Sequence, residues 1–248
     1  EVESPTHRLH DERGHEVAVL DNLSSGRRAN VDPRATFFEV DLTDEPALEA
    51  AMTTFRPEVI YHLAAQTSVP ISLTSPARDA EANIVGGVNL LNQAVAIGVR
   101  KVVNSSSGGA IYGNPVDVHC DESETIKPIS PYGVAKYCME QYLAMYHRTF
   151  GLAYTALRYA NVYGPRQVSA TDGAVIATFA QRMLTGQPIT IDGTGEQARD
   201  FVHVSDVVEA NVLAMKRGAN TAYNIGSGVL TTINEVFDLL AGYTNYQA

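Results

Sequence analysis

The sequence predicts a doubly wound α/β fold built on a parallel sheet, and three observations lead to it. Short, almost continuously apolar segments alternate with segments of helical periodicity. The apolar segments lack the polar–apolar alternation of a half-exposed strand, so helices are expected to bury them on both faces. Polar or small residues follow most of these segments directly. In such a sheet, ligands bind at the carboxyl ends of the strands.

The individual elements follow in chain order. Strands are predicted at 16–20, 36–40, 59–63, 101–105 and 154–158, and helices at 44–54, 79–97 and 132–150. Gly98 and Gly151 follow two of the helices, as a helix C-terminus favours. After Pro165 the pattern becomes irregular and rich in glycine. We therefore expect a first domain over residues 1–163 and a smaller lobe over residues 164–248, of which 200–217 pack back on the first domain.

Composition excludes several classes of partner. The 248-residue chain carries a net charge of −10, and it has no run of Lys or Arg that could neutralise phosphates. We therefore expect no nucleic acid and no anionic membrane surface as partner. The two cysteines and seven histidines form no metal-binding pattern, so no metal is expected. No apolar run reaches membrane-spanning length and no signal peptide is apparent, so a cytoplasmic location is expected.

The segment Tyr132-Gly-Val-Ala-Lys136 is the strongest candidate for chemistry. On a helix, the lysine lies one turn from the tyrosine on the same face. Its ammonium is expected to favour the phenolate and so to lower the pKa of the phenol. Ser107 follows a predicted strand and can lie beside the phenol. Such a set can take a proton from an alcohol while a hydride leaves the same carbon. The Tyr-x-x-x-Lys spacing also occurs by chance, so the pair alone is a weak signal.

Further motifs accompany this segment. They are Gly14-His-Glu-Val17, Asp21-Asn-Leu23, Asp41-Leu42, His62-Leu-Ala-Ala65, Ser105 to Gly113, Arg158 to Pro165, Arg199 to Val204, and Tyr223 to Gly228. With them the chain resembles the extended short-chain dehydrogenase/reductase superfamily, and within it the UDP-glucose (UDP-galactose) 4-epimerases. The resemblance covers nearly the whole chain and implies a Rossmann-like domain, NAD as cofactor and a UDP-sugar as substrate.

The resemblance also implies roles for individual residues. Tyr132 is the base, Lys136 holds the nicotinamide ribose, and Ser107 relays the proton of the sugar hydroxyl. Asp21 accepts hydrogen bonds from the adenine ribose, which favours NAD over NADP. The implied cofactor-binding residues are Asp21, Asn22, Asp41, Leu42, Leu63, Ala64, Ala65, Gln66, Asn83, Ser105, Tyr132, Lys136 and Tyr159. The implied substrate-binding residues are Ser107, Tyr132, Asn161 and Arg199. For four of these residues a purely structural role is the alternative to ligand binding. Asp41 could cap the following turn, Asn83 could be a buried hydrogen-bonding group, Arg199 could form an ion pair with Asp200 or Asp206, and Tyr159 could be a packing residue.

The stretch after Ser107 narrows the expected chemistry. Related dehydratases carry an acidic pair there and related decarboxylases favour a glutamate, whereas this chain has Gly108, Gly109, Ala110 and Ile111. Glycines beside Ser107 leave room for a hexose ring to turn, which suits an epimerase. A UDP-uronate or UDP-N-acetylhexosamine epimerase and a non-catalytic sugar-nucleotide-binding protein are the alternatives.

The N-terminus departs from the family pattern. The family's first strand should precede Glu1, and the last glycine of its phosphate-binding Gly-x-x-Gly-x-x-Gly turn should fall near Glu3. Because that strand is central in the usual order, we expect a gap in the sheet and weakened NAD binding. The C-terminal lobe is expected to be incomplete, with further substrate contacts beyond Ala248.

The resemblance implies a homodimer in which the helices at 79–97 and 132–150 pair with their copies. Their expected outward residues include Val88, Leu91, Val95, Tyr142 and Tyr146, and packing against the chain's own sheet is the alternative for some of them.

Overall fold

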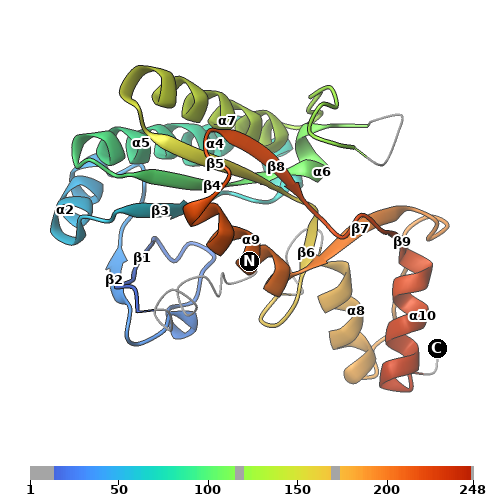
Figure 1. The fold of residues 1–248 in the computed structure, drawn as a ribbon. Coiled ribbons are helices and arrows are strands. Elements are labelled where there is room, and N and C mark those ends of the chain that lie inside the picture. Colours follow the sequence, from blue (N-terminus) through green and yellow to red (C-terminus); the bar gives the residue numbers. More distant parts are fainter. Residues whose placement is uncertain (1–13, 115–119, 169–173, 247–248) are drawn as a thin grey trace.

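The computed structural model describes residues 14–114, 120–168 and 174–246 (Figure 1). Glu3 and the positions where the glycine turn is expected lie outside these residues.

The described strands confirm the α/β class and the parallel sheet. Strands β3 (Val59–His62), β4 (Lys101–Ser107), β5 (Ala153–Tyr159) and β8 (Thr221–Ile225) form one sheet in the order β3-β4-β5-β8, and every pair is parallel. Strands β1 (Ala18–Asp21) and β2 (Thr36–Glu39) form a separate parallel pair. No strand among the described residues joins the two sheets. The expected gap therefore falls between the β1–β2 pair and the rest of the sheet (Figure 1).

Helices cover both faces of the four-stranded sheet. Helix α7 (Pro131–Phe150) contacts β4 and β5 on one face and packs against α5 (Gly86–Ala96), which in turn contacts α2 (Glu45–Phe55). Leu48, Leu91, Val102 and Leu143, all fully buried, lie in the core between these elements. Helix α9 (Val204–Lys216) also contacts β4 and β5, where Val103, Leu157 and Ala214 form a second cluster.

Helix α7 begins where the sequence dictates. The Ser130 hydroxyl accepts a hydrogen bond from the Gly133 N–H over 3.1 Å, and Pro131 occupies the first helical position, where its missing N–H costs nothing. The helix ends at Gly151, whose φ of 74° favours glycine. Tyr132 is thereby fixed in the first turn.

The predicted helix at 79–97 is present as one helical run that starts earlier, at Pro76, and contains a π turn. The run consists of α4 (Pro76–Ala80), the π-helical turn η2 (Glu81–Val85) and α5, and a separate short helix, α3 (Val69–Thr74), precedes it. The helical run starts at Pro76 because proline suits a first turn. Such π turns often mark functional sites, and this one carries Asn83.

Two of the apolar residues that were expected on the outward faces of the helices at 79–97 and 132–150 are buried instead. Leu91 and Tyr146 are buried in the chain's own core. Val88, Val95 and Tyr142 are partly buried. The apolar residues of α5 and α7 therefore serve mainly the intramolecular core, and most of them are not available to a second copy.

The C-terminal part adds a mixed sheet and a third core. Strand β6 (Asn161–Tyr163) pairs in parallel with β7 (Ala198–His203), which pairs antiparallel with β9 (Leu230–Thr232). Helices α8 (Val175–Leu184) and α10 (Ile233–Thr244) enclose Phe179, Met183, Ile233 and Val236. The remaining short helices are η1 (Arg28–Asn30) and α6 (Gly108–Ile111). The division at residue 163 stays a proposal.

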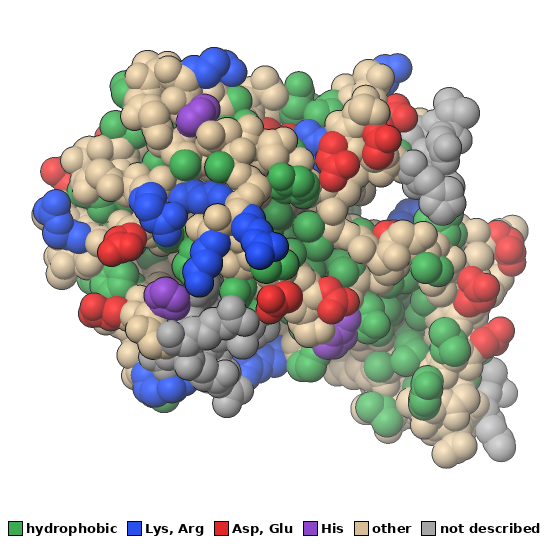
Figure 2. Space-filling model, viewed as in Figure 1, with side chains coloured by type: hydrophobic (Ala, Val, Ile, Leu, Met, Phe, Trp, Pro, Cys, Tyr) green, Lys and Arg blue, Asp and Glu red, His purple; other side chains and the backbone are tan. Residues whose placement is uncertain are grey.

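Figure 2 shows Lys and Arg side chains gathered over one end of α9, whereas acidic side chains predominate toward the C-terminal sheet. Lys101 Nζ donates to the Arg217 carbonyl over 2.7 Å, and Arg100 donates to the Met215 carbonyl over 3.5 Å. Cations at a helix C-terminus satisfy its open carbonyls and its negative dipole end.

In the described part of the chain, no helix has the length and apolarity needed to cross a membrane.

Candidate active site

Ser107, Tyr132 and Lys136 lie together at the carboxyl end of β4. Ser107 is the last residue of β4, and Tyr132 lies in the first turn of α7, which packs on that strand. The two side chains are hydrogen-bonded to each other. Lys136 Nζ donates to the Ser105 carbonyl over 2.9 Å and lies 5.7 Å from the centre of the Tyr132 ring.

Burial shifts both titrating groups of this set toward their neutral forms. It raises the pKa of Tyr132 to about 12, although the hydrogen bond from Ser107 opposes the rise. It lowers the pKa of Lys136 to about 8, and the carboxylate of Asp79 opposes that fall. The expectation that the lysine lowers the phenol's pKa is therefore not met, because burial, which disfavours the phenolate, is the largest influence on this pKa. A further positive charge at the site would be needed to lower the pKa of the Tyr132 phenol toward neutral pH.

At the adenosine side of the expected cofactor site, Asp21 ends β1 and Asp41 follows β2. Asp21 Oδ1 accepts the Leu23 N–H over 2.7 Å, and a Cβ on Gly26 would lie 3.0 Å from Asp21 Oδ2. The glycine thus leaves the carboxylate accessible. Asn22 Nδ2 donates to Asp41 Oδ2 over 2.6 Å, so the two strand ends are linked.

Asp41 also accepts hydrogen bonds from the Thr43 N–H and hydroxyl, which lower its pKa. It therefore caps the following turn, as the structural alternative proposes, while Leu42 beside it is buried in the core. Arg28, whose side chain could otherwise pair with the 2′-phosphate of NADP, lies over the Phe37 ring at 4.3 Å from its centre.

The segment after β3 is tied to the π turn. Leu63, Ala64 and Ala65 lead from the strand to Gln66, whose N–H donates to Asn83 Oδ1 over 2.8 Å. Asn83 Nδ2 donates back to the Gln66 carbonyl over 2.9 Å. Asn83 is buried, and its partners match the alternative of a buried hydrogen-bonding group.

Two of the expected substrate residues, Asn161 and Arg199, lie on the C-terminal sheet. Asn161 in β6 is in register with Phe201 in β7, so Asn161 and Arg199 share one face of the sheet. Arg199 is exposed and donates to the Ala198 carbonyl over 2.8 Å. Asp200 instead binds the N–H groups of Ser227 and Gly228.

Tyr159 ends β5 in register with Ser107. Its hydroxyl accepts a hydrogen bond from Asn211 Nδ2 of α9 over 2.7 Å, and burial raises its pKa. This phenol is therefore engaged in packing α9 onto the sheet.

Space is open beside Ser107. A Cβ on Gly109 would meet no atom within 4 Å, and one on Gly108 would lie 3.5 Å from the Arg158 carbonyl. No carboxylate lies at positions 108–111, so the chain offers no acid there.

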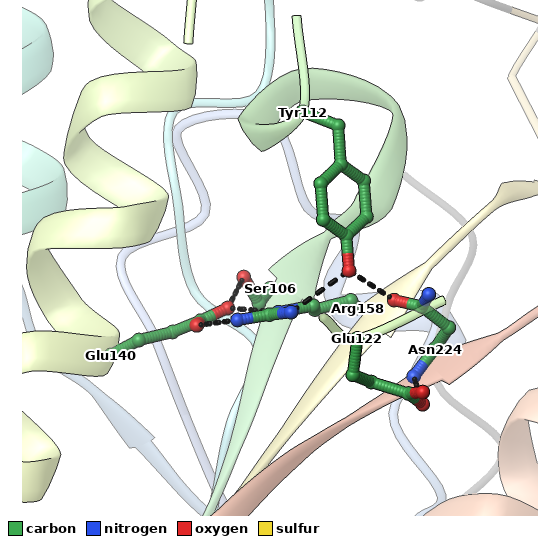
Figure 3. Close-up of polar contacts among 6 residues, drawn as sticks. All are labelled: Ser106, Tyr112, Glu122, Glu140, Arg158 and Asn224. Atoms are coloured by element: carbon green, nitrogen blue, oxygen red, sulfur yellow. Dashed lines mark hydrogen bonds and ion pairs between the residues drawn. The ribbon is translucent and has the colours of Figure 1, made fainter. Parts of the chain in front are cut away.

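Sequence reasoning missed a polar network that joins α7 to β5 and extends to Tyr112 and Asn224 (Figure 3). Arg158 of β5 and Glu140 of α7 form a bidentate ion pair, with Nη2–Oε2 at 2.7 Å and Nε–Oε1 at 3.1 Å. The Ser106 hydroxyl donates to Glu140 Oε1 over 2.5 Å. Arg158 Nη1 donates to the Tyr112 hydroxyl, which donates to Asn224 Oδ1, both over 2.8 Å. The spacing of Tyr132, Lys136 and Glu140, four residues apart on one helix, was the available signal.

The described residues contain no cluster of three or more His, Cys, Asp or Glu side chains that could hold a metal ion. Cys120 and Cys138 are partly buried, and neither is in a disulfide bond within the described part of the chain.

Comparison with known proteins agrees with this geometry. Residues 4–226 match the NAD dependent epimerase/dehydratase family. The putative UDP-glucose 4-epimerase of Methanocaldococcus jannaschii is 41% identical over 229 residues, which are 92% of this chain and 74% of that protein.

Two solved structures are also similar. The UDP-glucose 4-epimerase of Thermotoga maritima with UDP-glucose has a TM-score of 0.97 and 49% identity, covering 99% of this chain and 80% of that one. The Thermus thermophilus UDP-glucose 4-epimerase with NAD has a TM-score of 0.92 and 42% identity, covering 98% and 80%. With a family match over most of its length and relatives above 40% identity, the chain belongs to the NAD dependent epimerase/dehydratase family.

Proposed function

We propose that the chain catalyses NAD-dependent epimerisation at C4 of a UDP-hexose, interconverting UDP-galactose and UDP-glucose through a transient 4-keto sugar. The observation that carries the proposal is the meeting of Ser107, Tyr132 and Lys136 at the end of β4. The likeness to two UDP-glucose 4-epimerase structures supports the choice of substrate.

The described residues fit NAD at two points. The Asp21 carboxylate, kept accessible by Gly26, suits the hydroxyls of an adenine ribose. Lys136 has three N–H donors and uses one on the Ser105 carbonyl, which leaves two for the nicotinamide ribose. When bound, NAD⁺ supplies the hydride acceptor and a positive charge beside the phenol.

Tyr132 and Ser107 move the proton. The phenolate takes the C4 hydroxyl proton through the Ser107 hydroxyl, to which it is hydrogen-bonded. The same pair returns the proton when the 4-keto sugar is reduced on its other face. Lys136 holds a positive charge near the phenolate and so favours it. The open space at Gly109 supports rotation of the sugar between the two half-reactions.

The missing acid at positions 108–111 supports epimerisation over dehydration, because expelling water requires a proton donor at the leaving hydroxyl. A non-catalytic sugar-nucleotide-binding role is less well supported, since it has no need for a Ser–Tyr–Lys set with a buried lysine.

The purified chain, incubated with NAD and UDP-galactose, is expected to form UDP-glucose. Tyr132→Phe should lower the rate by roughly 10²–10⁴-fold, the usual contribution of a positioned acid–base group. Tyr137→Phe, on the same helix, is the matched control and should leave the rate unchanged. A Tyr132→Phe rate above a few per cent of the wild-type rate would contradict the role of the phenol.

We also propose a homodimer. Val85 and Val134 are about half exposed at the start of α5 and α7, which supports a further contact there. Sedimentation showing only monomer at micromolar concentration would contradict it. The cytoplasmic location stays a proposal.

A further inference from the structure

Asp79 is a buried carboxylate behind the Ser107–Tyr132–Lys136 set, and none of the roles above uses it. Its side chain lies in α4 and is 1% exposed. Oδ1 accepts hydrogen bonds from Gln66 Nε2 over 2.8 Å and from Asn83 Nδ2 over 3.1 Å. Oδ2 is buried and has no hydrogen-bond partner within the part of the chain that the structure describes. A buried carboxylate oxygen without a hydrogen-bond partner destabilises the folded state, so its presence suggests a function for the charge.

The bonds to Oδ1 fix the segment after β3. Because Oδ1 accepts from both amide NH₂ groups, Gln66 and Asn83 are each held in one orientation. Asn83 Oδ1 can then accept the Gln66 N–H, and Gln66 Oε1 accepts the Ser68 N–H over 2.6 Å. Asp79 therefore holds the turn that leads into the expected nicotinamide side of the site.

Helix α4, which carries Asp79, packs against α7, which carries Lys136, so the charge of Asp79 can act on the lysine. Burial lowers the pKa of Lys136 to about 8, and Asp79 supplies the attraction that opposes this fall. The other buried carboxylate near this end of α7, Glu140, is neutralised by Arg158. The remaining titratable neighbours, Tyr132 of α7 and His62 of β3, bring no negative charge at neutral pH, because the pKa of Tyr132 is about 12 and that of His62 about 3.

We propose that Asp79 is a positioning residue of the epimerase site: its charge keeps the buried Lys136 protonated, and its Oδ1 holds Gln66 and Asn83 in place. The inference rests on the proposed function for its catalytic consequence, but the state of Lys136 can be measured without turnover. If the carboxylate were absent, Lys136 would lose its proton nearer neutral pH and would no longer favour the phenolate, whereas the direct repulsion by which Asp79 raises the pKa of Tyr132 would also be removed.

Asp79→Asn separates charge from shape. Asparagine keeps an oxygen that can accept from Gln66 and Asn83 and removes only the charge. The chain has four lysines, Lys101, Lys127, Lys136 and Lys216, so ¹⁵N-lysine labelling gives four side-chain signals, and Lys136→Arg assigns the relevant one. Glu81→Gln is the matched control, because it removes one negative charge from the exposed side of the adjoining π turn.

The expected result is that Asp79→Asn moves the Lys136 titration to lower pH by roughly one unit, the effect of a neighbouring charge, whereas Glu81→Gln does not. The alkaline fall in kcat should move in the same direction, with KM for UDP-galactose changed less than about twofold, since Asp79 does not touch the sugar. A Lys136 titration that is the same in Asp79→Asn and wild type would overturn the proposal. If the Asn variant does not fold, Asp79→Ser is titrated instead, and the same comparison decides. A shifted Lys136 titration in a chain without epimerase activity would uphold the role of Asp79 and remove the proposed function.

Discussion

Glu140 and Arg158 form a bidentate ion pair that joins α7 to β5, and Glu140 follows Tyr132 and Lys136 at four-residue spacing along one side of the helix. Both side chains are buried, and each makes a further hydrogen bond: the Ser106 hydroxyl donates to Glu140 Oε1, and Arg158 Nη1 donates to the Tyr112 hydroxyl (Figure 3). Because Glu140 lies one helical turn beyond Lys136, the pair also fixes the rotation of α7 about its axis.

Breaking this pair should be strongly destabilising. Glu140→Leu leaves the Arg158 charge buried without a partner, which typically costs about 3–5 kcal/mol. The double variant Glu140→Leu/Arg158→Met should recover much of that loss, because no charge is then buried. Urea unfolding measures both. Arg34→Gln, which breaks the exposed Arg34–Asp32 pair, is the control and should cost at most about 1 kcal/mol. A loss in Glu140→Leu no larger than that of the control would contradict the account.

The unfolding free energy should depend on pH in the acid range because of the buried side chain of His62. Burial lowers its pKa from 6.5 to about 3, with Lys136 adding to the fall. Below pH 6.5 the unfolded chain binds a proton at this position that the folded chain does not, so stability falls as pH drops from 6.5 toward 3. His62→Gln should flatten this decline, measured as the unfolding free energy at several pH values. His15→Gln, at an exposed site, should leave the decline as in wild type. Parallel declines in His62→Gln and wild type would show that another group is responsible.

Asp21 should contribute to cofactor affinity. Asp21→Asn removes the charge from the hydrogen bonds offered to ribose hydroxyls, and bonds to charged groups are worth roughly 1.5–3 kcal/mol. We expect NADH binding, followed by fluorescence titration, to weaken about 10–100-fold. Asp44→Asn is the control: Asp44 caps α2, and asparagine caps equally well. Equal affinities for the two variants would remove Asp21 from the cofactor site.

The open space at Gly109 should be needed for turnover. Gly109→Val fills it with a branched side chain that meets no protein atom at its Cβ, so stability should change little. If the sugar rotates in this space, the valine side chain obstructs it, and the kcat/KM of the variant should fall by at least about tenfold. Gly242→Val, in α10 with equally open surroundings, is the control. Unchanged kcat/KM in Gly109→Val would place the sugar elsewhere.

The sequence predicted the sheet well because parallel, buried strands are nearly continuous apolar runs. Each predicted strand was found, with ends shifted by no more than two residues. Strand ends also brought Ser107 and Tyr159 into register. Periodicity could not reveal the π turn at Glu81–Val85, since one inserted residue barely disturbs a helical pattern.

Other features depend on tertiary packing. An apolar residue on a helix can face the chain's own sheet or a second copy, and the pattern is the same, which is why Leu91 and Tyr146 were wrongly expected to face outward. The four-residue spacing of Tyr132 and Lys136 could not predict the pKa of Tyr132, because burial of the phenol is the largest influence on that pKa. Asp79 and Glu140 gain their roles only from partners far away in the sequence.

The most direct test follows the hydrogen at C4. UDP-galactose carrying deuterium at C4 of the hexose is converted by the purified chain with NAD in ordinary water, and the UDP-glucose product is examined by NMR. We predict that deuterium stays at C4, because the hydrogen that leaves this carbon returns to it within the closed site and only the hydroxyl proton passes through Ser107 and Tyr132. Product with solvent hydrogen at C4, or with deuterium on another carbon, would contradict the account.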